Sequence, residues 1–139
     1  MAFTYNNMLD PNNIGAFAGL ANFSSIIRGG LFVVVFWNTI VYTLGVVAGS
    51  IGLGMISALL LNQTFIGRKV ARTLNMLPWA VPPVAAGLMW IYMFNPQAGI
   101  INFVLQSLNL ISGTKGWLDN MNLAMLSVLI VKIWLLYPF

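Results

Sequence analysis

The feature that most constrains this chain is the apolar run at residues 36–61, which holds no charged side chain over about 26 positions. A helix of that length rises about 39 Å, enough to cross a hydrocarbon core of about 30 Å with some tilt. In lipid a single segment satisfies its own backbone groups only as a helix. Although apolar character begins at Leu31, we place the start of the span near Phe36 and Trp37, because aromatic residues favour the membrane interface. The run therefore predicts a transmembrane helix.

Composition agrees with lipid as the solvent. Of the 139 residues 60% are hydrophobic and only 6% are charged, whereas soluble domains are about one-quarter charged. The chain has no Cys and no His, and its carboxylates, Asp10 and Asp119, lie far apart in polar stretches. These facts argue against an enzyme and predict no catalytic residue, metal site or cofactor. A net charge of +4 without a basic stripe also argues against a nucleic-acid partner.

Two further apolar runs follow, at residues 73–94 and 123–139. The first is about 22 residues long, and the second, about 17, is at the short limit for a span. The sequence thus predicts an all-α, polytopic transmembrane protein.

The short polar segments give an orientation. Segment 62–72 carries Arg68, Lys69 and Arg72, more cations than either neighbouring polar segment. The positive-inside rule therefore predicts that 62–72 is a cytoplasmic basic loop and that segments 1–35 and 95–122 are extracytoplasmic. Within these outer segments, residues 19–27 and 99–108 have apolar side chains at helical spacing. They predict short interfacial helices, an interpretation we favour over a ligand role.

Small residues recur at intervals of four along the first span. This spacing puts them on helix faces where another backbone, of this chain or of another subunit, can approach closely. The alternative is that glycine is simply commoner in membrane helices than in soluble ones. We favour a packing role for Gly45, Ala48, Gly49, Ser50, Gly52, Gly54 and Ala58.

The second apolar run contains Pro78, Pro82 and Pro83. Proline lacks an N–H and disrupts a helix, which is tolerated at membrane depth where protein or a water-filled cavity shields the freed carbonyls. Interrupted helices of this kind form solute sites and moving parts in transporters. A static kink needed only for packing is the alternative. Trp79 and Trp90 flank the break; an indole can stack on a sugar face, or Trp90 can serve as an interfacial anchor.

Lys132 is the one charge inside a predicted span, about 13 Å from its start. Intramembrane charges usually face a protein interior or a water-filled cavity. The alternative is that its long stem reaches the interface by snorkelling. We favour the interior, with any partner carboxylate lying outside this chain.

Four pieces of the sequence together resemble the inner-membrane permease subunits of binding-protein-dependent ABC importers. The likeness is greatest to the carbohydrate-uptake branch, which includes maltose-type and glycerol-3-phosphate-type permeases, and it covers nearly the whole chain. The pieces are "FAGLANF" at 17–23, "ALLLNQTFIGRKVARTLNMLPWAVPPVAAGLMW" at 58–90, "FNPQAGIIN" at 94–102, and "GWLDNMNLAM" leading to "VKIWLLYPF" at 131–139.

This resemblance implies a six-helix, MetI-like core in a bacterial or archaeal inner membrane. It also implies partners: a second permease subunit, cytoplasmic ATP-binding subunits and an extracytoplasmic solute-binding protein. The chain would then be an internal piece that holds the second, third and part of the fourth core helices, without the loop that docks on the ATPase. Family members often carry an acidic residue where Lys132 stands.

The function expected from these features is passage of a sugar or related small solute, with residues 77–90 lining the path. Two alternatives remain open. One is a permease for an amino acid or a peptide, and the other is a small membrane scaffold that transports nothing.

Overall fold

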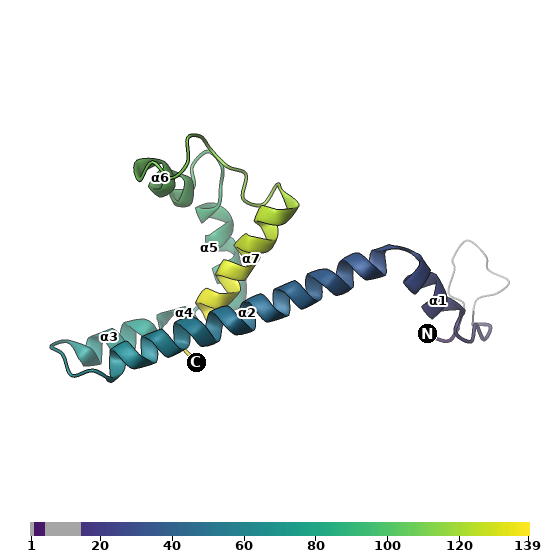
Figure 1. The fold of residues 1–139 in the computed structure, drawn as a ribbon, viewed down its shortest axis with the longest axis horizontal. Coiled ribbons are helices and arrows are strands. Elements are labelled where there is room, and N and C mark those ends of the chain that lie inside the picture. Colours follow the sequence, from purple (N-terminus) through teal and green to yellow (C-terminus); the bar gives the residue numbers. More distant parts are fainter. Residues whose placement is uncertain (1, 5–14) are drawn as a thin grey trace. The chain divides into compact units, whose positions relative to one another are not determined.

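The computed structural model describes residues 2–4 and 15–139. Within them the chain is helical and contains no strand beyond one isolated bridge, between Thr4 and Phe17 (Figure 1). It divides into two compact units, Met1–Val41 and Tyr42–Phe139. The helices are α1 (Ala21–Arg28), α2 (Leu31–Asn62), α3 (Arg68–Asn75), α4 (Leu77–Ala80), α5 (Pro83–Met93), α6 (Ile100–Ser107) and α7 (Met121–Leu136).

The first unit holds the short helix predicted at residues 19–27, which the structure shows as α1. The side-chain amide of Asn22 fastens it by donating hydrogen bonds to the carbonyl oxygens of Ala2, at 3.0 Å, and Thr4, at 3.1 Å. Asp10 lies outside the described residues.

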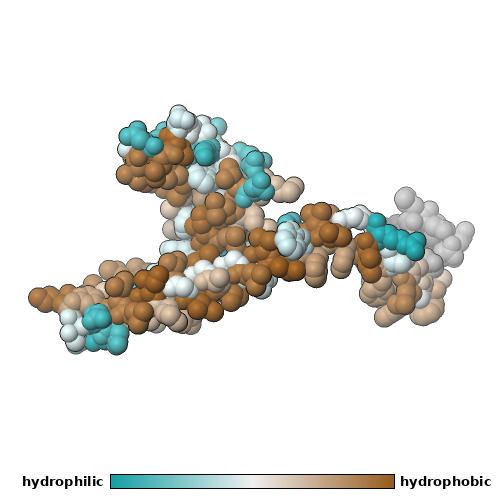
Figure 2. Space-filling model, viewed as in Figure 1, coloured by the Kyte–Doolittle hydropathy of each residue, from teal (hydrophilic) through white to brown (hydrophobic). Residues whose placement is uncertain are grey.

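Helix α2 is 32 residues long and begins at Leu31, five positions before the predicted start. The prediction used the aromatic preference for the interface, which marks a bilayer boundary and not the end of a helix. Among the described residues α2 is the one single helix that is long and apolar enough to cross a membrane. Its apolar side chains are largely exposed (Figure 2), as expected of a surface that meets lipid or other membrane helices.

The basic segment is not a loop throughout. Helix α3 begins at Arg68, so all three cations predicted to lie on a loop are in the helix. Gly67 precedes it with φ +90°, a left-handed conformation that glycine adopts without strain. Val70 and Leu74 lie four positions apart in this helix, a helical spacing that the charge-based prediction did not use.

The proline-rich run is divided into two arms, Arg68–Ala80 and Pro83–Met93, bent by 94°. The residue before a proline is pushed out of the α region, and here this affects two consecutive residues. Val81 is extended, with φ −79° and ψ 125°, and Pro82 likewise has ψ 135°. Pro83 then occupies the first turn of α5, where its missing N–H costs nothing. Because of this bend, residues 73–94 form a broken span or a re-entrant turn, and not one straight helix.

Helix α6 confirms the short helix predicted at residues 99–108, and its end is built by local bonds. Asn109 takes φ 54°, its N–H bonds the Gln106 carbonyl at 2.9 Å, and the Leu110 N–H bonds the Leu105 carbonyl at 2.9 Å. This is a Schellman cap, with asparagine in place of the usual glycine.

Helix α7, of 16 residues, begins two positions before the predicted run at 123. The side-chain oxygen of Asn120 caps it, accepting from the N–H groups of Asn122 at 2.9 Å and Leu123 at 3.5 Å. In the second unit several buried side chains meet at Trp117, which contacts Phe94, Asn102 and Ser127. The other buried side chains of this unit are Val46, Pro78 and Ala86.

Candidate functional site

The prolines predicted to interrupt the span occupy different positions in the structure. Pro82 and Pro83 are exposed and lie at the 94° bend. Pro78 is buried in the first turn of α4, a position that proline tolerates, and does not lie at the bend. Trp79 and Trp90 stand on opposite sides of the break, in α4 and α5. Trp79 is 60% exposed and makes an edge contact with Phe139 at 5.2 Å between ring centroids.

Trp90 and Lys132 line the same cavity, of about 260 Å³, which we call the Trp90 cavity. Its walls are almost wholly apolar, so Lys132 contributes its aliphatic stem and not its ammonium group. Among the described residues no salt bridge pairs Lys132 with a carboxylate. The cavity walls include Trp90, Phe94, Leu118, Ser127, Val131 and Lys132.

A chain of aromatic rings runs past this cavity. Trp90 lies between Trp134, at 5.6 Å, and Phe94, at 5.3 Å between ring centroids. Phe94 in turn lies 6.0 Å from Trp117. Trp90 is therefore held by packing from both α5 and α7, so the structure gives it a fixed position in the wall.

Sequence reasoning missed the most heavily bonded side chain of the second unit, Asn102. Its Nδ2 donates to the carbonyls of Pro96, at 3.1 Å, and Lys115, at 3.0 Å. Its Oδ1 accepts from the Lys115 N–H at 3.3 Å and from the Trp117 indole at 2.9 Å. An asparagine amide has two donor hydrogens and two acceptor positions, and all are used. The signal that could have revealed it was an asparagine among the apolar residues at the start of this short helix.

Ser127 was also missed, and its side chain is fully buried. Its hydroxyl lies 2.8 Å from the Leu123 carbonyl, one turn back along α7, and 3.2 Å from the Trp117 carbonyl. The contact with Trp117 joins α7 to the segment that precedes it.

Part of the predicted small-residue face packs against α7. A Cβ on Gly45 would lie 2.9 Å from the Leu129 side chain, and one on Gly49 would meet Ile133. One on Gly54 would lie 2.8 Å from the Tyr137 carbonyl oxygen. Along α2 the successive glycines meet residues that come successively later in the chain, so α2 and α7 run in the same direction along this contact.

Gly52 does not take part in that contact, and the Ser50 hydroxyl donates within α2 to the Val46 carbonyl at 2.6 Å. A Cβ on Gly52 would meet nothing within 4 Å. Ala48 and Ala58 are exposed, although Ala58 lines a groove of about 570 Å³ beside Arg72 and Phe139. Within the described part of the chain, the face with Ala48 and Gly52 is open.

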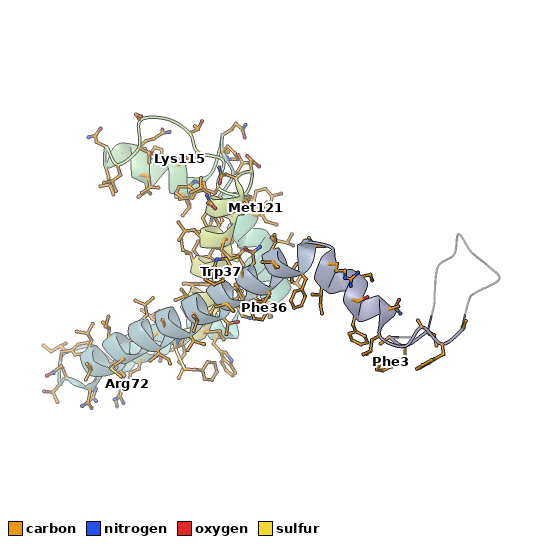
Figure 3. The ribbon with its side chains drawn as sticks, turned by 45° about the vertical axis from the view of Figure 1, so that its right-hand side comes forward. Phe3, Phe36, Trp37, Arg72, Lys115 and Met121 are labelled. Atoms are coloured by element: carbon orange, nitrogen blue, oxygen red, sulfur yellow. The ribbon has the colours of Figure 1, made fainter. Side chains whose placement is uncertain are left out.

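The cations used for orientation lie at one end of the second unit. Figure 3 shows Arg72 near the end of α2, far from Lys115 and Met121 at the other end of the unit. Arg68 and Arg72 both donate to the Leu61 carbonyl near the end of α2, whereas Lys69 is exposed.

Comparison with known proteins supplies what the geometry alone does not. No family model matches the chain. It is 35% identical over 132 residues to the inner membrane ABC transporter permease protein YcjO of Escherichia coli K12, covering 94% of this chain and 45% of that protein. It is 35% identical over 119 residues to a probable ABC transporter permease protein of Brucella suis biovar 1, covering 86% and 41%.

A third relative is the sn-glycerol-3-phosphate transport system permease protein UgpA of Yersinia enterocolitica. The identity is 29% over 130 residues, covering 91% of this chain and 42% of that protein. The chain therefore spans less than half the length of these curated relatives. The apolar α2 and the inner-membrane relative confirm the predicted membrane location and the all-α membrane fold. Over the part of its relatives that it spans, the chain belongs to the ABC transporter permeases.

Proposed function

We propose that this chain is part of the permease subunit of an ATP-driven ABC importer and forms part of the path for a sugar or related small solute. The observation that carries the proposal is the 35% identity to an ABC transporter permease over 94% of the chain. The sugar-type solute is supported by the sn-glycerol-3-phosphate permease among the relatives.

The bend at Val81–Pro82 is the proposed moving part. Between α4 and α5 two consecutive residues have left the α region, so backbone hydrogen bonding along the run is interrupted there. A change of angle between Val81 and Pro82 breaks no backbone hydrogen bond of either arm. The last bond of the first arm is donated by the Val81 N–H, and the first bond of α5 is accepted by the Pro82 carbonyl. The bend can therefore open or close while α5 and the arm Arg68–Ala80 each stay intact.

The Trp90 cavity is the proposed lining of the path on the α5 side of the bend. Its apolar walls offer an indole face, on which a sugar ring can stack, but few hydrogen-bonding groups. Polar recognition of the solute would then come from parts of the transporter beyond these walls.

The proposed topology keeps segment 62–72 in the cytoplasm and segments 1–35 and 95–122 outside. Arg72 and Lys115 lie at opposite ends of the second unit, in accord with this arrangement (Figure 3). In this proposal the chain makes and breaks no bond. ATP-binding subunits, a second permease and an extracytoplasmic solute-binding protein complete the transporter, and the outer segments face the binding protein.

The test is uptake of labelled sugars by cells that express the complete reading frame together with its neighbouring transport genes. The double variant Pro82→Ala/Pro83→Ala should lower the maximal uptake rate at least several-fold, because the bend can then close into continuous helix. Pro78→Ala is the matched control, since Pro78 lies in a tolerated helical position away from the bend.

ATP hydrolysis is measured in the same membranes. Normal uptake and normal stimulation of ATP hydrolysis in the double variant would remove the role of the bend. Uptake of an amino acid or a peptide instead of a sugar would reassign the solute. Absence of uptake for every solute class in the unchanged protein would favour the scaffold.

A further inference from the structure

We propose that Asn102, Trp117 and Ser127 form a latch that fixes one wall of the Trp90 cavity, and that Asn102 is a positioning residue for the passage of solute. The effect on solute passage rests on the proposed function, because it requires that the cavity lines a transport path. The hydrogen bonds and ring contacts that form the latch do not depend on that function.

Asn102 closes the segment between α5 and α7 into a loop. It is 3% exposed and bonds residues six, 13 and 15 positions away, on both sides of α6. Because each of its four hydrogen-bonding positions is filled, any rotation of the amide leaves buried polar groups unpaired. The side chain therefore holds Trp117 in one place.

Trp117 is held from three directions. Its indole N–H donates to Asn102 at 2.9 Å, its ring lies 6.0 Å from Phe94, and its carbonyl accepts from the Ser127 hydroxyl at 3.2 Å. These partners belong to α6, to the end of α5 and to α7. One residue outside the helices thus fixes the spacing of three elements.

The latch reaches the cavity directly. Phe94, Ser127 and Leu118 all line the Trp90 cavity, and Leu118 follows Trp117 in the chain. A displaced Trp117 would move Leu118 and release Phe94 together. The closed latch therefore keeps this wall in place, and a weakened latch would open the cavity.

This chain contains no cysteine, and any cysteine in the rest of the complete reading frame is replaced by serine for the test. A single reporter, Val131→Cys, is placed on α7 in the cavity wall, where Val131 is half-buried. Its rate of reaction with a maleimide is measured in membranes, in the absence of solute, with the protein expressed from its complete reading frame. Loss of the latch should speed the reaction, because the reporter becomes more accessible.

Three variants weaken the latch in different ways. Trp117→Phe removes the indole N–H and keeps a ring beside Phe94, Ser127→Ala removes the hydroxyl, and Asn102→Ala removes the whole amide. Trp117→Phe and Ser127→Ala should each raise the labelling rate roughly two- to tenfold, the factor by which one net hydrogen bond shifts an equilibrium. Asn102→Ala, which loses four hydrogen bonds, should raise it further. Ser107→Ala is the matched control, because Ser107 makes the same one-turn bond, to the Phe103 carbonyl at 2.8 Å, without a second partner.

The double variant Asn102→Ala/Trp117→Phe separates positioning from general destabilisation. If both residues act through their shared bond, the double variant reacts no faster than Asn102→Ala alone, whereas independent effects would multiply. In uptake, the latch variants should raise the half-saturation concentration more than they lower the maximal rate.

Unchanged labelling in Trp117→Phe and Ser127→Ala, or multiplicative effects in the double variant, would overturn the latch. So would failure of both single variants to accumulate in the membrane, because these groups would then be needed for folding and not for position. The labelling assay needs no solute. If the permease imports no sugar, the proposed function is wrong, but the labelling rates still test the latch.

Discussion

The Nε atom of Arg68 donates a 2.7 Å hydrogen bond to the carbonyl oxygen of Leu61, one residue before the end of α2. Arg72 reaches the same oxygen at 3.4 Å. The last carbonyls of a helix have no partner within it, and the negative end of the helix dipole favours cations there. These two arginines therefore fasten the turn between α2 and α3 in addition to any part they have in membrane orientation.

This contact predicts different effects for two charge-neutralising changes in the same segment. Arg68→Gln should lower the free energy of unfolding in detergent by about 1 kcal/mol, since it loses a charged donor at a half-exposed site. Lys69→Gln removes the same charge from an exposed position and should leave stability unchanged. Both should weaken orientation equally in a topology-reporter assay. Equal losses of stability in the two variants would contradict the role of the Arg68–Leu61 bond.

Two glycines of α2 should respond in opposite ways to alanine. Gly54→Ala places a methyl group against the Tyr137 backbone carbonyl, which cannot move aside as a flexible side chain can. Overpacking of this kind costs about 1–3 kcal/mol. Gly52→Ala meets open space and should raise stability by about 0.5–1 kcal/mol through better helix propensity.

Chemical unfolding of the chain in detergent measures both glycine variants. A destabilising Gly52→Ala would show that the face with Ala48 and Gly52 is occupied by another helix. A neutral Gly54→Ala would show that α2 and α7 are not packed at Tyr137.

The bend should straighten when its cause is removed. Spin labels at Val70 and Met89, both exposed, report on the two arms of the broken run. In Pro82→Ala/Pro83→Ala the distance between the labels should increase, because Val81 and residue 82 regain access to the α region. Pro78→Ala should leave the distance distribution unchanged. An identical distribution in the double variant would mean that tertiary packing, and not the prolines, holds the 94° angle.

Lys132 is expected to hinder insertion of α7 by its charge alone. Lys132→Met keeps the length of the stem that lines the Trp90 cavity and removes the ammonium group. Insertion of α7, followed by a glycosylation reporter, should improve by about 2–3 kcal/mol, the cost of a lysine near the centre of a membrane helix. No improvement would show that the ammonium group is already paired or hydrated during insertion.

The helical class and most helices could be predicted because they follow from local patterns. The apolar run of α2 and the spacing of apolar residues in α1 and α6 depend only on neighbouring residues. The break at Val81–Pro82 follows directly from two adjacent prolines. The 94° angle does not, since local rules say where a helix stops and not where the next one points.

The candidate site was predicted only in part, for a related reason. Trp90 and Lys132 were chosen separately, and the structure brings them to one cavity through the packing of α5 against α7. Asn102 was missed because its partners lie up to 15 positions away and no spacing rule pairs them. Gly45 and Gly49 are four positions apart and both lie against α7 in the structure, but nothing in the sequence of α2 identifies α7 as the neighbouring helix.

The length of α2 bears on how it can lie in lipid. At about 1.5 Å per residue, its 32 residues extend about 48 Å, against a hydrocarbon core of about 30 Å. A helix that exceeds the core in this way tilts or extends into the headgroup layer. Because Gly45 and Gly49 pack on Leu129 and Ile133, a tilt of α2 is transmitted to α7. The angle at which this pair crosses the bilayer should therefore change with the acyl-chain length of the phospholipids around it.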